Sequence, residues 1–163
     1  MNVTEHFSLE EFACKDSTPY PIGNLDEITG ATWMTSRLVP LCDTLERVRA
    51  RLARNLGEDV AVYVSSGYRS PAYNGALSGA AKDSQHMRGR AADVKVFTGK
   101  GAQRRQVDPG RVHDTVLVMH LAGEMPHLGG LGRYPEFTHI DTRPRPEDDH
   151  LARWNGTRKS NRI

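Results

Sequence analysis

The chain has 163 residues, with 22 Lys and Arg, 20 Asp and Glu, and a formal net charge of +2 at pH 7. This length predicts one domain whose hydrophobic core is large enough to fold without disulfides or a structural metal. The small net charge argues against nucleic acid as a partner, and no run approaches the roughly 18 apolar residues of a membrane helix, which argues against membrane insertion.

The first predicted element is a short helix near the N-terminus. Ser8 and Glu11 have the spacing of a capping box, in which each side chain binds the backbone N–H of the other residue, and the helix should continue through Cys14. Residues 15–32 are rich in Pro, Gly, Asp and Thr, so we expect a loop there.

A long amphipathic helix is predicted from about residue 39 to residue 56. Pro40 is tolerated in its first turn, and Gly57 is the expected stop signal. Apolar residues recur at helical spacing and indicate a stripe that faces the core. They are Leu38, Leu41, Cys42, Leu45, Val48, Leu52 and Leu56.

The next segment predicts a strand followed by a short helix. Residues 60–64 are apolar and rich in valine, which is typical of a buried strand. The strand leads into residues 66–69, after which Ser70 and Pro71 have the residue types of a helix N-cap and a first helical residue.

Beyond residue 98 the sequence predicts a loop, a helix and an edge strand. Residues 98–106 form a basic, glycine-containing segment, and Asp108 with Pro109 should start a helix that ends near Gly123. Residues 129–135 are rich in glycine and predict a flexible turn and an edge strand. A few helices flanking a small, mainly antiparallel sheet make an α+β fold.

Residues 137–141 predict a short strand with a polar face. Because side chains alternate along a strand, Phe137, His139 and Asp141 should share one face. The other face then carries Thr138 and Ile140.

A second polar strand lies upstream, at residues 92–96, and carries Asp93. Gly89 gives the preceding loop the freedom to turn, so that His86 can come back over this strand. Together with His139, these residues supply two imidazoles and one carboxylate, which are ligands that zinc accepts. A fourth position left to water is typical of a catalytic zinc site.

Three motifs in this order resemble the zinc D-alanyl-D-alanine carboxypeptidase family, and most closely its branch of small cell-wall peptidases and phage endolysins. They are Ser-Gly-Tyr-Arg-Ser at 66–70, SxHxxGxAxD at 84–93 and His-Ile-Asp at 139–141, and the resemblance covers roughly residues 4–154. It implies the fold of these peptidases, which the hedgehog signalling domain shares. It also implies that one zinc ion is bound by His86, Asp93 and His139.

The resemblance extends to residues that act on the substrate. Residues matching Arg69 and Ser84 contact the peptide or the transition state. In several members a carboxylate three residues before the last zinc histidine is the general base, and Glu136 holds that place here. Other members of the branch have no acid there.

The residues also leave alternatives open. Arg69 could stabilise a turn or bind a carboxylate or an oxyanion, and Ser84 could cap the loop that presents the first histidine. Tyr68 could line the cleft or pack in the core. Asp141 could orient a ligand or contact the substrate, and His127 could contribute from the glycine-rich segment that precedes the last ligand.

The two cysteines bear on the cellular compartment. Cys14 and Cys42 fall in predicted helical segments without CxxC spacing, which indicates buried, reduced thiols. The N-terminus lacks the basic and then apolar pattern of a secretory signal, so we expect synthesis in the cytoplasm. The protein would then act on the cell wall after release, as phage lysins do by leaving through holin-made lesions.

We expect one zinc peptidase domain over residues 1–154 and a basic tail over residues 155–163. The predicted function is that of a monomeric zinc metallopeptidase that cleaves the stem or cross-link peptides of peptidoglycan, which contain D-amino acids. One alternative is a cytoplasmic D-alanyl dipeptidase. The other is a hedgehog-like module that binds zinc without turnover.

Overall fold

The structure, a computed structural model, describes residues 1–157 of the chain. Within them lies one sheet with the strand order β1-β2-β5-β4-β6, and β3 pairs with β2 beyond the end of β5. Neighbouring strands are antiparallel except β4 and β6, which are parallel. The strands are β1 (Val60–Ser66), β2 (Ala91–Thr98), β3 (Arg105–Gln106), β4 (Gly130–Arg133), β5 (Thr138–Asp141) and β6 (Ala152–Asn155).

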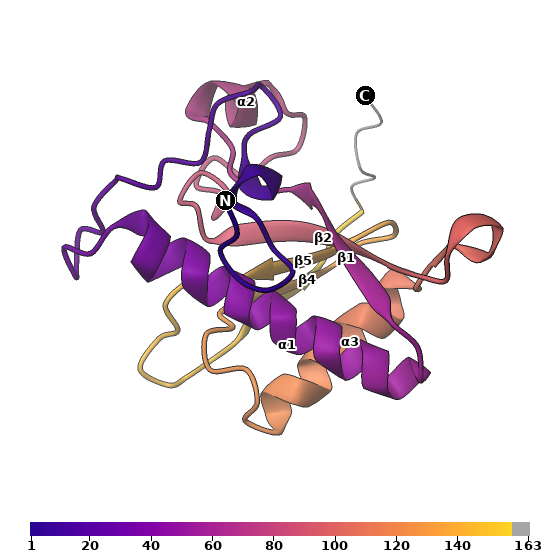
Figure 1. Cartoon of the computed structure of the whole chain (residues 1–163). Coiled ribbons are helices and arrows are strands. Elements are labelled where there is room, and N and C mark those ends of the chain that lie inside the picture. Colours follow the sequence, from indigo (N-terminus) through magenta and orange to yellow (C-terminus); the bar gives the residue numbers. More distant parts are fainter. Residues whose placement is uncertain (158–163) are drawn as a thin grey trace.

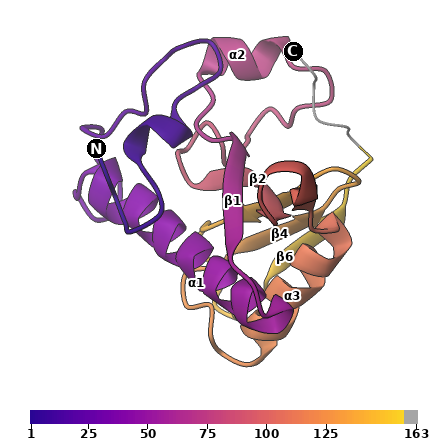
Figure 2. The ribbon, with the colours of Figure 1, turned by 45° about the vertical axis from the view of Figure 1, so that its right-hand side comes forward.

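Two long helices lie together on one side of the sheet, as Figures 1 and 2 show from two directions. The shorter helix α2 lies on the other side, whereas the N-terminal segment reaches α1, where the His6 backbone N–H donates a hydrogen bond to Glu46. This arrangement confirms the predicted α+β class. The helices are α1 (Val39–Leu56), α2 (Pro71–Ala76) and α3 (Pro109–Leu121), with the short turns η1 (Leu9–Phe12), η2 (Met34–Leu38) and η3 (Gly101–Gln103).

Helix α1 ends where the sequence predicts. Gly57 adopts a left-handed conformation with φ 68°, and its N–H bonds the carbonyl groups of Ala53 and Arg54. It also begins at residue 39 as predicted, but the sequence does not predict the π-helical turn η2 that runs directly into it. The spacing of the apolar residues does not distinguish this wider turn from a loop.

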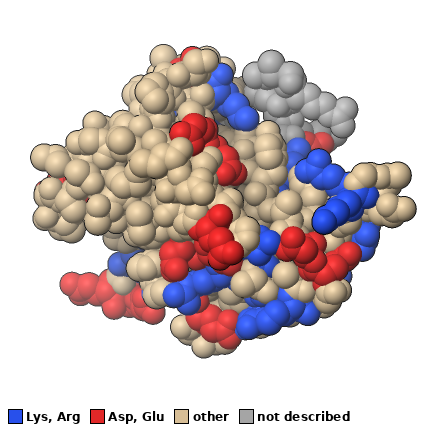
Figure 3. Space-filling view, in the orientation of Figure 1, with Lys and Arg blue, Asp and Glu red and all other residues tan. Residues whose placement is uncertain are grey.

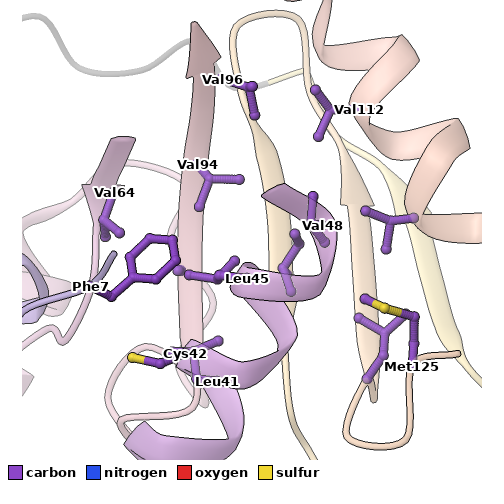
Figure 4. Packing of buried hydrophobic residues seen from close by; sticks show 14 of the residues in the cluster. Phe7, Leu41, Cys42, Leu45, Val48, Val64, Val94, Val96, Val112 and Met125 are labelled. Carbon is purple, nitrogen blue, oxygen red and sulfur yellow. The ribbon is translucent and has the colours of Figure 1, made fainter. Parts of the chain in front are cut away.

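The hydrophobic core lies between the sheet and the two long helices. Leu45 and Val48 of α1 are fully buried against Val94 and Val96 of β2, and Val112 of α3 completes the layer (Figure 4). Truncating a fully buried leucine of this kind typically costs about 2–5 kcal/mol of stability. Because Val94 and Val96 face the long helices, the side chains at the alternate positions of β2 point to the opposite face of the sheet, away from α1 and α3.

The C-terminal part of the sheet corrects one prediction. Residues 129–135 were expected to form an edge strand, but β4 lies inside the sheet between β5 and β6. Strand β6 is absent from the sequence-based expectation and takes the edge instead. Its four residues alternate in burial, but they are too few for a period to stand out.

The described surface over α1 and α3 carries intermingled acidic and basic side chains (Figure 3). Pairs such as Asp43 with Arg47 and Arg49 with Asp59 account for part of this pattern. Within residues 1–157, none of the helices has both the length and the apolar character to cross a membrane. The basic residues of the predicted tail at Arg158, Lys159 and Arg162 lie outside the described residues.

Candidate metal centre

Asp93 and His139 meet because their strands pair in register. Asp93 of β2 is directly opposite His139 of β5 in an antiparallel pair, and both side chains are on the face away from the long helices. His139 Nδ1 lies 2.9 Å from Asp93 Oδ1. The neighbouring residues Thr138 and Ile140 point to the helical face, where Ile140 joins the core and Thr138 donates to the Pro109 carbonyl of α3. The predicted alternation along this strand is therefore confirmed.

His86 reaches the same place from a loop. Its Nε2 lies 3.2 Å from Asp93 Oδ1, and its Nδ1 donates a hydrogen bond of 2.7 Å to the Gly67 carbonyl. Gly89 turns the loop with φ +64°, and a Cβ there would lie 2.7 Å from the hydroxyl of Tyr20. Glycine is thus required at this turn for both its backbone conformation and its lack of a side chain.

The N-terminal part of the chain holds this loop in place. Tyr20 donates a hydrogen bond of 2.7 Å to the Gly89 carbonyl, and Arg37 donates one of 2.8 Å to the Arg88 carbonyl. Arg37 is only 1% exposed, and its guanidinium lies over the Trp33 ring at 4.0 Å. These two bonds fix the backbone on the C-terminal side of His86.

The donor set of His86, Asp93 and His139 fits a zinc ion. One ligand atom from each residue lies within 4.8 Å of the others, and all three side chains are buried. The outer nitrogen of each ring has an acceptor, the Gly67 carbonyl for His86 and Asp141 for His139. Such partners fix the tautomer so that the inward nitrogen offers its lone pair. Within residues 1–157, these three side chains form a cluster whose ligand atoms lie close enough together to hold a metal ion.

Electrostatics at the centre favour positive charge between the carboxylates. Burial alone would lower the pKa of His139, but hydrogen bonds to Asp141 and Asp93 outweigh it and raise the pKa to about 9. Burial would likewise raise the pKa of Asp93, but the two imidazoles hold it well below its usual range. Burial lowers the pKa of His86, which keeps this ring neutral and able to act as a ligand.

Two predicted substrate contacts adjoin the metal residues. Arg69 is buried, and its Nη2 donates a hydrogen bond of 2.9 Å to Asp93 Oδ2 while its Nε donates one of 3.1 Å to the Ser66 hydroxyl. Ser84 is also buried, and its hydroxyl accepts a hydrogen bond of 3.3 Å from the His86 backbone N–H. Both roles weighed for Ser84 are therefore compatible with its position.

Asp141 lies behind His139 and is fully buried. Its Oδ2 accepts a hydrogen bond of 2.9 Å from His139 Nε2, and Arg143 donates to both of its oxygens from Nε at 2.9 Å and Nη2 at 2.6 Å. A side chain with 0% exposure cannot contact a substrate, so this geometry favours the orienting role. Arg143 was missed by sequence reasoning, because an arginine beside an HID motif carries no signal of its own.

A cavity of about 620 Å³ opens over the metal residues. It combines polar groups from the loop that carries His86 with aromatic groups from the edge of the sheet where β4 and β6 lie. Its lining residues are Arg69, Gly79, Ala81, Asp83, Ser84, Gln85, His86, Asp93, Tyr134, Phe137, His139, Arg143, Trp154, Gly156 and Thr157.

Besides Asp141, three predicted site residues do not line this cavity. Tyr68 packs against Tyr20 and Trp33, with ring centroids 6.0 and 6.4 Å away, so the packing alternative describes it. His127 is exposed, and its Nε2 lies 4.0 Å from Asp43 of α1, on the helical side of the sheet. Glu136 is half-buried next to Phe137, and its backbone carbonyl accepts a hydrogen bond from Gln106.

Both cysteines are buried and unpaired, in agreement with the sequence-based expectation. Burial raises the pKa of the Cys42 thiol to about 12, so this group is uncharged at neutral pH. Neither cysteine adjoins the donor set of the metal centre, which consists of two histidines and one aspartate.

Comparison with models of protein families gives a match over most of the chain. The family model described as Peptidase M15 matches residues 5–141, from the N-terminal segment to the last residue of β5. The curated proteins and the solved structures contain no significant match to the chain. The matched region includes the whole donor set and ends before β6.

Proposed function

Because the match covers most of its length, the chain belongs to the M15 family of zinc peptidases, and from this premise we propose that it cleaves peptidoglycan peptides. The substrate class is the stem or cross-link peptide, which contains D-amino acids. The observation that supports the proposal most directly is the buried set of two imidazoles and one carboxylate at the base of a cavity of about 620 Å³. A cavity of this size holds a few peptide residues.

The zinc ion would be held by His86 Nε2, the Asp93 carboxylate and His139 Nδ1. When bound, zinc polarises a scissile carbonyl and lowers the pKa of a coordinated water toward about 7. The protein's contribution is to fix these ligands. Gly67 orients one imidazole through its carbonyl, and Asp141 orients the other.

Arg69 has two parts in the proposal. Its bond to Asp93 Oδ2 holds the carboxylate so that Oδ1 faces the imidazoles. Because it also lines the cavity, its charge stabilises negative charge that develops on the substrate. Ser84 lines the cavity beside it and offers a hydroxyl to the peptide backbone.

The general base takes the proton of the attacking water and passes it to the leaving amine. Glu136 is the first candidate, because it lies between two residues that line the cavity, Tyr134 and Phe137. Asp83 is a second candidate that sequence reasoning missed. Apart from Asp93 it is the one carboxylate among the described lining residues, and it accepts two hydrogen bonds from Arg88.

The test is digestion of purified sacculi by the zinc-loaded protein, with mass spectrometry of the released muropeptides. New peptide termini would identify the bond, and loss of turbidity would identify a lytic enzyme. Hydrolysis of D-alanyl dipeptides without action on sacculi would support the dipeptidase instead. Zinc binding with neither activity would support a binding module. We further propose that the protein is made in the cytoplasm and reaches the wall after release.

A further inference from the structure

One row of residues crosses the sheet through the metal centre and continues beyond it. Asp93 is opposite His139, His139 is opposite Gly132 of β4, and Gly132 is opposite Trp154 of β6. The row therefore connects two proposed ligands with a tryptophan on the last strand. This tryptophan lies outside the region that the family model matches, which ends at residue 141.

Gly132 allows Trp154 to reach the centre. A Cβ on Gly132 would lie 2.7 Å from Cε2 of the indole, so the ring occupies the space that a side chain on β4 would fill. The indole thereby comes within 5.0 Å of the His139 ring, measured between centroids. Trp154 remains partly exposed, and it lines the cavity.

Trp154 is part of an aromatic wall, which we define as Tyr134, Phe137 and Trp154. The indole Nε1 donates a hydrogen bond of 2.9 Å to the Tyr134 hydroxyl. The rings of Tyr134 and Phe137 stack with centroids 4.4 Å apart and planes inclined by 15°. Gly156 lies against Tyr134, where a Cβ would be 2.0 Å from the ring. These contacts fix the wall in one geometry before any substrate arrives.

The aromatic wall has a fixed cation beside it. The Arg143 guanidinium lies 5.3 Å from the centroid of the Trp154 ring, and Asp141 binds its Nε and Nη2. Besides this aromatic wall, the cavity is also lined by hydrogen-bonding groups such as Ser84 and Gln85. A ligand that matches it has an apolar side chain on a polar backbone, which is the chemistry of a peptide residue such as alanine.

We propose that Trp154 is a specificity-determining residue, whose indole, together with Tyr134 and Phe137, holds the apolar side chain of a substrate residue next to the scissile bond. This inference rests on the proposed function, because it places a peptide in the cavity. It extends that function by assigning substrate selection to β6. A carboxylate at the same place would lose its hydration against the aromatic rings, and the nearby Arg143 already binds the Asp141 carboxylate through Nε and Nη2.

The kinetic test compares Trp154→Ala and Trp154→Phe with Asn155→Ala as the matched control. Asn155 is the exposed neighbour on the same strand and does not line the cavity. Once the cleaved bond is known from the muropeptide products, the apolar residues beside it are replaced by glutamate in synthetic peptides. We expect wild type and Asn155→Ala to prefer the apolar peptide. Trp154→Ala should raise KM by about 10-fold or more with little change in kcat, and should lose most of this preference, while Trp154→Phe retains part of it.

Bound zinc is measured in every variant, because Trp154 also touches His139. The proposal expects zinc affinity to be unchanged in Trp154→Phe and Trp154→Ala. Loss of zinc from both would show that the indole acts through His139, and would overturn the assignment to substrate selection. Unchanged KM and unchanged preference in Trp154→Ala would overturn it as well.

A fluorescence measurement separates this inference from the proposed function. The chain has two tryptophans, so in Trp33→Phe the emission reports Trp154 alone. The zinc-loaded protein is titrated with a soluble stem pentapeptide that ends in D-Ala-D-Ala. A saturable change in emission supports the aromatic wall even if no peptide bond is cleaved, and no change overturns it even if sacculi are digested. If Trp33→Phe does not fold, the emission difference between wild type and Trp154→Phe gives the same readout.

Discussion

Arg69 donates a hydrogen bond of 2.9 Å from Nη2 to Asp93 Oδ2, and both side chains are buried. The other oxygen of Asp93 faces His86 and His139. The guanidinium therefore determines which oxygen of the carboxylate is presented to the metal. Removing the guanidinium leaves Asp93 Oδ2 without this buried partner, while Oδ1 keeps its contacts with the two imidazoles.

We accordingly predict that Arg69→Ala weakens zinc binding by about 10- to 100-fold, the range typical of residues that orient a metal ligand. Arg69→Lys should recover only part of the loss, because an ammonium cannot reproduce the fork of the guanidinium. Zinc affinity is measured by competition with a chromophoric chelator. Arg47→Ala on the exposed face of α1 is the control, and equal affinities in Arg69→Ala and this control would contradict the orienting role.

The ligand assignment itself predicts the behaviour of His86→Ala and His139→Ala. Each should lose stoichiometric zinc and peptidase activity while keeping the far-ultraviolet circular dichroism of the wild type. The fold should persist because the core lies on the other face of the sheet from these residues. Metal content after dialysis decides the matter, and about one zinc per chain in either variant would refute the assignment.

Glu136 and Asp141 should respond differently to removal of charge. Glu136→Gln is expected to keep its zinc, bind the stem peptide and lose roughly two to four orders of magnitude in kcat, the usual effect of removing a positioned base. Asp141→Asn is expected to weaken zinc binding by about 10- to 100-fold, because it holds His139.

The comparison with Asp83→Asn assigns the base. Asp83 lines the cavity, whereas Glu136 is next to a lining residue. Both substitutions replace a carboxylate with the corresponding amide, so a difference in kcat reports the position of the carboxylate. A near-normal kcat in Glu136→Gln, together with a large loss in Asp83→Asn, would transfer the role to Asp83. The ligand assignment would be unaffected by either result.

The cysteines should be unreactive thiols in the folded protein. Cys42 is fully buried, with its pKa raised to about 12, and Cys14 is buried as well. The thiolate is the reactive form, so Cys42 should not react with Ellman's reagent until the protein is unfolded. Intact mass under non-reducing conditions should equal the reduced mass, and a deficit of two hydrogens would show a disulfide instead.

Acid should destabilise the fold through Asp26. The Thr29 backbone N–H and the Arg37 guanidinium hold the pKa of Asp26 well below its usual range. A carboxyl group whose pKa is lowered by folding stabilises the fold above its unfolded pKa of about 3.9, and this stabilisation is lost as the pH falls below about 4. Urea unfolding of wild type and Asp26→Asn between pH 6 and pH 3 should therefore give stability curves that approach each other as the pH falls below about 4. Parallel curves over the whole range would disprove the linkage.

Periodicity and spacing predict the parts of this fold that are local in sequence. Helix α1 with its Gly57 stop, the capping box at Ser8 and the alternation around His139 all follow from contacts within a few residues. The capping box forms as expected, with Glu11 accepting from the Ser8 backbone N–H, although the helix that it starts is a short 3₁₀ turn ending at Phe12.

Pairings between distant segments could not be predicted in this way. Strand β6 is defined by its parallel partner β4, and nothing within Ala152–Asn155 specifies that partner. Likewise, Tyr68 belongs to an aromatic cluster whose other members, Tyr20 and Trp33, precede it by more than thirty residues. The motif places Tyr68 near the site, but only the tertiary packing determines which way its ring points.

The hydrogen bonds from Tyr20 and Arg37 to the loop that carries His86 have a consequence for biosynthesis. The centre depends on residues near the start of the chain, on the 69–93 segment and on His139 near its end. Contacts between such distant segments form late in folding, because closing a long loop costs entropy first. A chain that is still on the ribosome, or one cut within its first forty residues, lacks part of this framework. The order of synthesis would therefore leave the metal centre incomplete until the segment that carries His139 has been made.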